Sequence, residues 1–211
     1  TTEESSGASD VYKRQKLSWA EKYPNTHRAL IMALLEACAW IEQPENRQGL
    51  IQLLASDLYI NTPVEDIAPS LTGTMNYSQG DQPVQLDDFS IFHRYAANFP
   101  WRSHAEWIIT QMYRWGQIDQ LTDIQALANR IYRPDIYREA ANALGMPTPS
   151  IDHKPEGAHA DSWKLSDATR PIPMGPDQFF DAQQYDAADP MGYLKAFTVK
   201  HIAAGTAAKL T

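Results

Sequence analysis

Apolar residues recur at helical spacing along most of residues 17–145, in segments separated by proline, glycine and capping residues. Residues 25–41 are apolar on nearly every face, which is typical of a helix that is buried on all sides. A second helix is predicted over residues 45–55, after Pro44 in its first turn, because its leucine and isoleucine residues share one face. The pattern therefore predicts a structure dominated by helices, with residues 25–41 the most buried.

Capping residues set the limits of the other predicted helices. Residues 62–65 form a capping box, in which the Thr62 hydroxyl accepts from the amide of Glu65, and this short helix is expected to end before Pro69. A second capping box at residues 103–106 opens a helix that is expected to run to Trp115. Two further helices are predicted, over residues 122–131 and 134–145.

Other segments interrupt this regular array. Residues 72–88 hold glycine, proline and Asn/Asp turn signals without a sustained period, so an irregular surface loop is predicted there. A helix is expected to follow over residues 89–98 and to stop at Pro100. Strand signals are weak, and we expect at most two or three short strands, around residues 58–61 and within the C-terminal tail.

The sequence changes character after Gly145. Residues 146–190 are rich in proline and have no helical period, yet aromatic residues are spread through them, which is unusual for a disordered linker. We therefore predict an extended arm, residues 146–211, that lies over the surface of a helical body formed by residues 16–145. Aromatic side chains are expected to hold it there, and a short helix is expected at residues 190–197.

Residues 1–15 differ from both of these regions. They contain no apolar stretch of the kind found in a signal peptide, and their Ser, Gly and Glu content is typical of a linker. The string DVYKRQ at residues 10–15 also resembles translated adapter sequence. We therefore predict a non-native or disordered leader, and we expect the chain to be the C-terminal part of a longer protein.

Charge and cysteine content exclude several classes of partner and site. The 211 residues carry 18 Lys and Arg against 26 Asp and Glu, a formal net charge of −8, whereas a surface that binds nucleic acid needs clustered basic residues. Cys38 is the single cysteine, which excludes an internal disulfide and a cysteine-based zinc site. The apolar stretch at residues 29–41 is shorter than the roughly 20 residues of a membrane span, so no transmembrane segment is predicted.

The turn at residues 97–104 is the first candidate for binding chemistry. It places Trp101, Arg102 and His104 beside the free amides of a predicted helix N-terminus. This combination suits a small anion, because helix amides and a guanidinium both favour negative charge. A structural interpretation stays open beside it, in which Arg102 pairs with an acidic neighbour while Trp101 and Trp107 fill a core.

Two groups of residues in the tail have side chains that can bind metals, but neither group has the backbone support or the spacing that a metal site needs. The loop that carries the first group has no supporting element to hold tetrahedral geometry. The second group lacks the spacing of an EF-hand. We therefore predict a solvated loop and turn-forming aspartates, with no metal and no cofactor. The first group is His153, Glu156, His159 and Asp161, and the second is Asp177, Asp181, Asp186 and Asp189.

Signatures of common catalytic sites are absent from the sequence. It has no Gly-rich phosphate loop, no Gly-x-Ser-x-Gly elbow and no His-Glu-x-x-His motif. Cys38 lies in the middle of an apolar helix, away from any helix N-terminus that would stabilise its thiolate. The sequence therefore favours a protein without catalytic residues.

Three stretches, read together in their order and spacing, resemble one family. They are WAEKYPNT at residues 19–26 with residues 29–37 and 45–47, FPWRSH at residues 99–104 with residues 114–116, and Phe179-Phe180-Asp181. Over about Ser18 to Phe197 the chain is similar to the C-terminal half of the nitrate and bicarbonate substrate-binding proteins of ABC importers. The tail departs from the family pattern at Ala182, where the family usually has glycine.

The resemblance implies an α/β fold of the periplasmic-binding-protein class (type 2, two-lobed), here a mostly helical C-terminal fragment with a wrapping arm. It also implies a small anion as ligand, nitrate, nitrite, bicarbonate or cyanate, bound without catalysis. The implied partners are the membrane subunits of an ABC transporter, and the implied location is periplasmic or on the outer face of the membrane. The family's ligand contacts lie mostly upstream of this segment, so the main pocket is expected outside these residues.

Two alternatives of other classes stay open at this point. The first is a cytoplasmic nitrate sensor of the same fold, which holds an RNA-binding antiterminator inactive until ligand binds. The second is the receptor-like extension of a transporter ATPase subunit. The acidic charge of the chain suits the receptor and the sensor alike.

Overall fold

The computed structural model describes residues 16–78, 80, 82–121 and 123–197. The predictions for residues 1–15 and for the end of the arm, 198–211, concern residues outside this part. The described strands form two antiparallel pairs, β1 (Thr74–Met75) with β2 (Val84–Gln85) and β3 (Trp163–Leu165) with β4 (Ile172–Met174). The helices are α1 (Leu17–Lys22), α2 (Pro24–Glu42), α3 (Pro44–Ala55), α4 (Val64–Thr72), the 3-10 helix η2 (Arg94–Ala96), α5 (Arg102–Arg114), α6 (Ile124–Ile131), α7 (Pro134–Ala143) and α8 (Pro190–Leu194).

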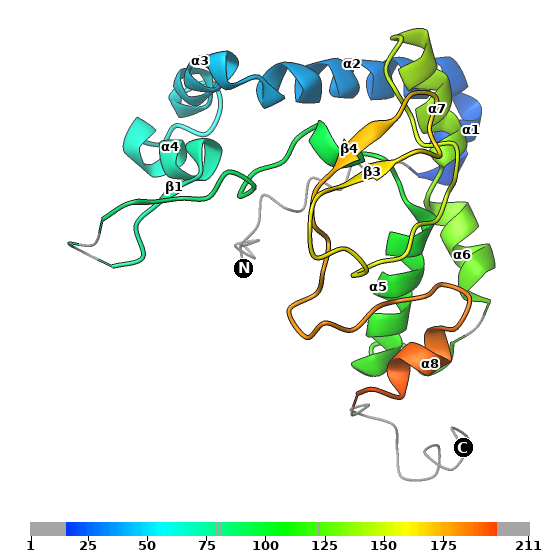
Figure 1. Ribbon diagram of the computed structural model, residues 1–211. Helices are drawn as coiled ribbons and strands as arrows, with labels where there is room; N and C mark the ends of the chain where they lie inside the picture. The colour runs from blue at the N-terminus through cyan, green and yellow to red at the C-terminus, as the bar shows by residue number, and fades with distance from the viewer. Residues whose placement is uncertain (1–15, 79, 81, 122, 198–211) are drawn as a thin grey trace.

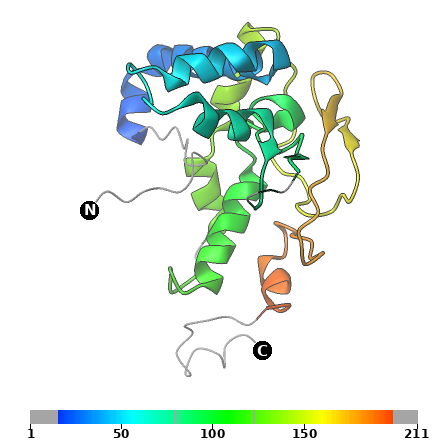
Figure 2. The ribbon, with the colours of Figure 1, turned by 90° about the vertical axis from the view of Figure 1, so that its left-hand side faces the viewer.

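Helix α2 spans the molecule and joins two groups of elements (Figure 1). At its N-terminal end it packs against α7. We call α5, α6, α7, α8 and the β3–β4 pair, which lie on this side, the large unit. At its C-terminal end it packs against α3, which with α4, β1 and β2 forms what we call the small unit. In the perpendicular view the C-terminal tail runs down beside α5 to α8 (Figure 2).

The core of the large unit draws on segments that lie far apart in the sequence. Leu35 of α2 belongs to one buried cluster with Tyr137 of α7, residues of the β3–β4 pair, and Phe99 and Trp101 from the turn before α5. The Phe99 ring meets the rings of Trp101 and Tyr137 edge-on, with centroids 4.7 and 5.1 Å apart. The tail thus supplies part of this core, through Leu165, Ile172 and Met174, where the sequence predicted an arm over a surface.

The core of the small unit is built from one contiguous stretch of chain. Four buried residues of α3 and α4 form it, with Ile41 and Phe92 packed at its margin: Leu50, Ile51, Ile67 and Leu71. Helix α3 therefore has the buried face that its sequence predicts. Gly73 ends α4 with a φ of 74°, where a Cβ would lie 2.3 Å from the carbonyl oxygen of Leu86. This tight turn starts the β1–β2 pair inside residues 72–88, which the sequence presents as an irregular loop.

The prediction that residues 25–41 are the most buried element is wrong. Among the residues of α2, Leu35 is buried, whereas Leu30 and Trp40 are exposed by 37% and 48%. The helix is apolar on nearly every face, but the described elements that pack on it are mainly α7 on one side and α3 at its C-terminal end, with α1 at its N-terminal end. Apolar surface on the remaining faces of α2 is left open to solvent.

The helix predicted over residues 89–98 is also wrong. Only η2 forms there, because Tyr95 and Ala96 have φ angles of 64° and 52°, which an α-helix excludes. The amides of Phe92 and His93 do not start a helix but donate to the carboxylate of Glu42. A tertiary contact that no local pattern signals thus replaces the helical hydrogen bonds.

Both predicted capping boxes are used differently in the structure. Helix α4 begins after Pro63 without a side-chain cap, and the Thr62 hydroxyl donates to the carbonyl of Ile60 at 3.4 Å. The helix also continues through Pro69 to Thr72, since a proline inside this short helix removes a single hydrogen bond. At the start of α5, the Ser103 hydroxyl donates to Glu156 at 2.6 Å instead of capping the helix.

The remaining elements follow their sequence signals more closely. Asp123 caps α6 by accepting from the amide of Ala126 at 2.9 Å, and Gly145 follows α7 with a φ of 68°. The strand expected around residues 58–61 is wrong, because the chain turns there and exposes its apolar side chains. In the tail, Phe179 stacks on Trp107 of α5 with centroids 5.4 Å apart, and the Tyr185 side chain is buried.

Candidate functional site

The turn before α5 places Trp101 in the core of the large unit. Pro100 and Trp101 are extended, and α5 begins at Arg102. Trp101 is 1% exposed, with the Phe99 ring on one side and the ammonium of Lys154 6.0 Å from its ring centroid. The indole therefore serves as a wall between the core and a cluster of charged side chains from the tail.

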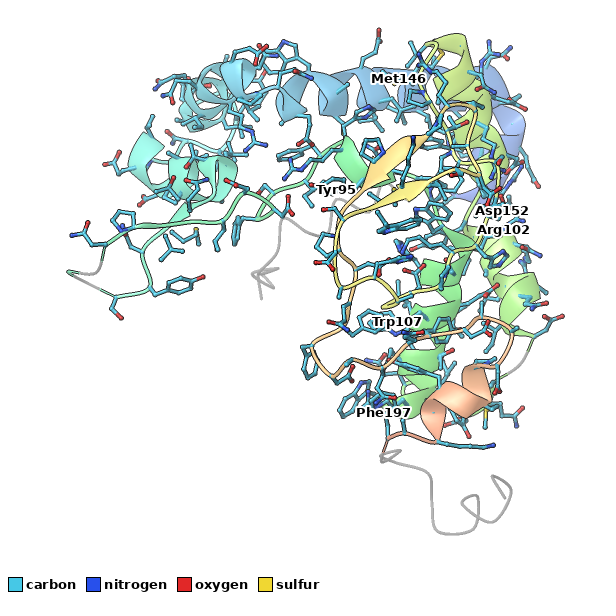
Figure 3. All side chains as sticks on the ribbon, in the orientation of Figure 1. Tyr95, Arg102, Trp107, Met146, Asp152 and Phe197 are labelled. Carbon is cyan, nitrogen blue, oxygen red and sulfur yellow. The ribbon has the colours of Figure 1, made fainter. Side chains whose placement is uncertain are left out.

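Arg102 faces the tail and has an acidic partner there. Its guanidinium pairs with the Oδ2 atom of Asp152, and its amide donates to the Asp152 carbonyl at 2.9 Å (Figure 3). The other carboxylate oxygen of Asp152 accepts from Arg138 of α7 at 2.6 Å. Two guanidinium groups thus share one carboxylate, which leaves this cluster with one excess positive charge.

His104, two residues after Arg102 in α5, contacts the carboxylate of Glu156. Its Nε2 atom is 3.3 Å from the Oε2 atom of Glu156. Glu156 also pairs with Lys154, whose ammonium lies 3.1 Å from Asp177, and all but His104 of these groups are largely buried. Burial alone would raise the pKa of Glu156, but the hydrogen bond and charge of His104 and the ammonium of Lys154 outweigh it and lower that pKa.

Trp101 and His104 line the same hollow, which has a volume of about 310 Å³. Gly175 forms part of its wall, where a Cβ would come within 2.8 Å of the Tyr95 ring. Arg102 does not line it. The other lining residues are Ile91, Tyr95, Ala96, Ala97, Lys154, Glu156, Met174, Pro176, Asp177 and Phe179.

The charge around this hollow does not favour an anion. Lys154 is the lysine among the lining residues, and two carboxylates, those of Glu156 and Asp177, already bind it. An added anion would have to compete with both of them for the same ammonium. The excess positive charge lies instead at Arg102 and Arg138, outside the lining of the hollow.

The residues of the first metal-like group are divided among different partners. His153 lies 3.0 Å from Glu106, His159 binds Asp177 and stacks on Trp163 at 3.9 Å, and Asp161 is exposed. Within the described part of the chain, no three His, Cys, Asp or Glu side chains come together as metal ligands.

The aspartates of the second group have separate structural contacts. Asp177 binds Lys154 and His159, whereas Asp181, Asp186 and Asp189 each accept from a backbone amide two or three residues further along the chain. Asp189 in this way caps α8. The contacts of Asp181, Asp186 and Asp189 are those of turns and caps, as the sequence predicts, whereas Asp177 has tertiary partners that it does not predict.

Sequence reasoning missed the polar cluster that joins α5 to the tail. Four polar side chains of this cluster are buried: Ser103, Glu106, Lys154 and Glu156. The sequence pattern predicts a helix cap for the first two. Their spacing is that of a cap, so the local pattern gives no sign of the tertiary partners. The available signal is the pair Lys154 and Glu156, two charges of opposite sign two residues apart in a proline-rich stretch.

Comparisons with known proteins place this geometry in a family context. The model of the NMT1-like family matches residues 15–55. The nitrate/nitrite binding protein NrtA of Synechococcus elongatus is 34% identical over 90% of this chain and 39% of its own length. The bicarbonate-binding protein CmpA of the same species is 30% identical over 88% of this chain and 39% of its length.

The fold of this chain also matches a solved structure of a nitrate-binding protein. The crystal structure of the periplasmic nitrate-binding protein NrtA from Synechocystis matches 86% of this chain with a TM-score of 0.70 and 27% identity. The chain is homologous to part of the nitrate- and bicarbonate-binding proteins. It spans about two-fifths of the length of these curated relatives and has the fold of the matching part of NrtA. The family resemblance and the fold class expected from the sequence motifs are confirmed.

A relative of another kind is also similar. The nitrate import ATP-binding protein NrtC of Synechocystis is 34% identical over 86% of this chain, and the match covers 24% of that protein.

Among the described residues, no helix is both long enough and apolar enough to cross a membrane.

Proposed function

We propose that the chain is part of the solute-binding component of an importer for a small inorganic anion: nitrate, nitrite or bicarbonate. The observation that carries the proposal is the likeness to the periplasmic nitrate-binding protein NrtA, in sequence and in fold. The protein would then act without catalysis, in the periplasm or on the outer face of the membrane, and deliver its ligand to the membrane subunits of the transporter.

Of the three candidate contacts, Arg102 has the electrostatic environment that best suits an anion. It shares Asp152 with Arg138, which leaves an excess positive charge, whereas the hollow beside Trp101 and His104 is rich in carboxylates. The same ion pair also ties α5 to the tail. Arg102 is therefore expected to affect stability at least as strongly as affinity.

The test is titration calorimetry of nitrate, nitrite and bicarbonate into the full natural protein. A binding component is expected to hold one of them in the micromolar range or tighter, roughly −8 kcal/mol at 1 μM. The 211-residue chain by itself is expected to show no measurable affinity, since a cleft site takes contacts from both of its walls. Failure of the full protein to bind any of the three anions would overturn the proposal.

Arg102→Ala and Arg133→Ala are the matched variants in this titration. Both remove a guanidinium that is paired with an aspartate, but Arg133 pairs with Asp135 on the exposed start of α7. Loss of binding in Arg102→Ala alone, with an unchanged melting temperature, would assign Arg102 to the ligand. Loss of stability with retained affinity would assign it to the fold, which is the result we expect.

A second candidate function rests on the likeness to NrtC. In that case the chain belongs to the receptor-like part of an import ATP-binding protein. Since the match covers a smaller share of NrtC than of NrtA, the two candidates predict natural polypeptides of different size. An immunoblot of the source organism with an antibody to residues 16–197 separates them. The relatives described above give no support to the cytoplasmic sensor.

A further inference from the structure

The chain passes between the large and small units at two places that lie together. Among the described residues, none belongs to both cores. One passage is the C-terminal half of α2, which has Leu35 in the large core and Ile41 beside the small one. The other is the segment from Phe92, beside the small core, to Ala96, in the large core.

Glu42, the last residue of α2, joins these two passages. Its Oε2 atom accepts from the amides of Phe92, His93 and Arg94 at 2.8, 2.7 and 3.4 Å. Its Oε1 atom pairs with the guanidinium of Arg94 and lies 3.7 Å from that of Arg47, on α3. A single carboxylate thus connects α2, α3 and the segment that returns to the large unit.

The surroundings of Glu42 favour its charged form. Its side chain is 10% exposed, and burial alone would raise its pKa, but the amides of His93 and Phe92 and the guanidinium of Arg94 outweigh burial and lower that pKa. Hydrogen bonds to a charged acceptor are stronger than those between neutral groups. The carboxylate therefore remains in place as an ion at neutral pH.

The backbone directly after these amides is strained. Tyr95 and Ala96 both have positive φ angles, which are unfavourable for residues with a Cβ and persist only where the surrounding structure enforces them. Tyr95 is held by the Arg94 guanidinium, 5.4 Å from its ring centroid, and by the close approach of Gly175. The same short segment thus holds both the Glu42 contacts and an unfavourable backbone conformation.

We propose that Glu42 is a latch that fixes the orientation of the small unit relative to the large unit. The strained pair Tyr95–Ala96 is the point at which the returning segment turns when the latch is open. Neither core contains Glu42, so release of its carboxylate does not by itself remove a side chain from either of them. The latch sets how rigidly the two units are held together, independently of what the protein binds.

The experiment measures the distance between the units by pulsed electron paramagnetic resonance. Spin labels are placed at Leu58→Cys in the small unit and at Asp161→Cys in the large unit, both at exposed positions, in a chain that also carries Cys38→Ala. Glu42→Ala is expected to broaden the distance distribution at least twofold. Glu36→Ala is the matched control, because Glu36 is an exposed residue of the same helix.

Hydrogen exchange shows whether the units themselves stay folded. Unchanged protection of the amides around Ile51 and Ala140 in Glu42→Ala, together with the broadened distances, would support the latch. An unchanged distance distribution would overturn it. Loss of protection around Ile51 in both Glu42→Ala and the milder Glu42→Gln would also overturn it, since Glu42 would then be needed to fold the small unit.

Discussion

The large and small units solve the problem of burying apolar surface in different ways. The large core combines residues from α2, the turn before α5, α7 and the tail, so its members extend along the chain from Leu35 to Met174. The small core uses residues between Ile41 and Phe92. Contacts between distant segments bury Trp101 and Tyr185 almost completely, whereas the small unit leaves Leu58 and Tyr77 exposed by 84% and 70%.

This contrast indicates where stability and local order come from in the chain. Segments with few buried apolar contacts open locally at a lower free-energy cost than a well-packed core. The small unit is therefore expected to open before the large unit.

The largest effect is expected for a truncation in the large core. Trp101→Ala removes an indole that is 1% exposed and contacts Phe99, and large-to-small changes of buried aromatics cost about 3–5 kcal/mol. The variant is expected to lose most of its stability in a urea titration followed by circular dichroism. A loss below 1 kcal/mol would show that this core is not what holds the large unit together.

A truncation in the small core is expected to act locally. Ile51→Ala removes a fully buried side chain, a change that costs about 2–5 kcal/mol in a well-packed core. Hydrogen exchange should show faster exchange across α3 and α4, while the amides of α5 and α7 keep their protection. Equal loss of protection in both units would mean that they unfold as one, and the comparison drawn above would be wrong.

The polar cluster beneath α5 is expected to contribute a pH-dependent part of the stability. Because the pKa of Glu156 is lowered in the folded chain, its contribution is present above its usual value of 4.5 and is lost as the pH falls through the folded pKa. Glu156→Gln is expected to cost about 1–3 kcal/mol at pH 7, since Lys154 and Ser103 lose a charged buried partner.

Thermal melts between pH 3 and pH 7 check this expectation. The difference in melting temperature between the unaltered chain and Glu156→Gln should shrink as the pH falls below 4.5 and through the lowered pKa of the folded chain, because the carboxylate itself is then protonated. A difference that stays constant over this range would show that the loss comes from packing and not from charge. Asp161→Asn, at an exposed position, is the control.

The sequence predicted elements whose determinants are local. The buried face of α3 and the end of α7 at Gly145 both depend on residues within one or two turns of each other, and these predictions are confirmed. The failures share a cause of another kind. Residues 92–94 donate to Glu42, some 50 residues away, and Ser103 donates to Glu156 at a similar separation.

The candidate site divides along the same line. The sequence singled out Trp101, Arg102 and His104 as neighbours in one turn, and they are neighbours along the backbone. Their partners come from the tail, however, so Arg102 pairs with Asp152 and His104 with Glu156. Charge and spacing singled out residues of types that suit an anion, but they did not show which of them the tail already pairs.

The smallest effect is expected at the tip of the tail, where two identical residues stand side by side. Phe179 stacks on Trp107 of α5, whereas the neighbouring Phe180 is fully exposed. Phe180→Ser is expected to change the free energy of unfolding by less than about 0.5 kcal/mol, as is usual for surface positions without special contacts. Phe179→Ser should cost more, because it removes the aromatic contact that joins the tail to α5. Urea titrations of the two variants make the comparison within one turn of chain. Equal losses would mean that the tail is not held to the large unit by this stack.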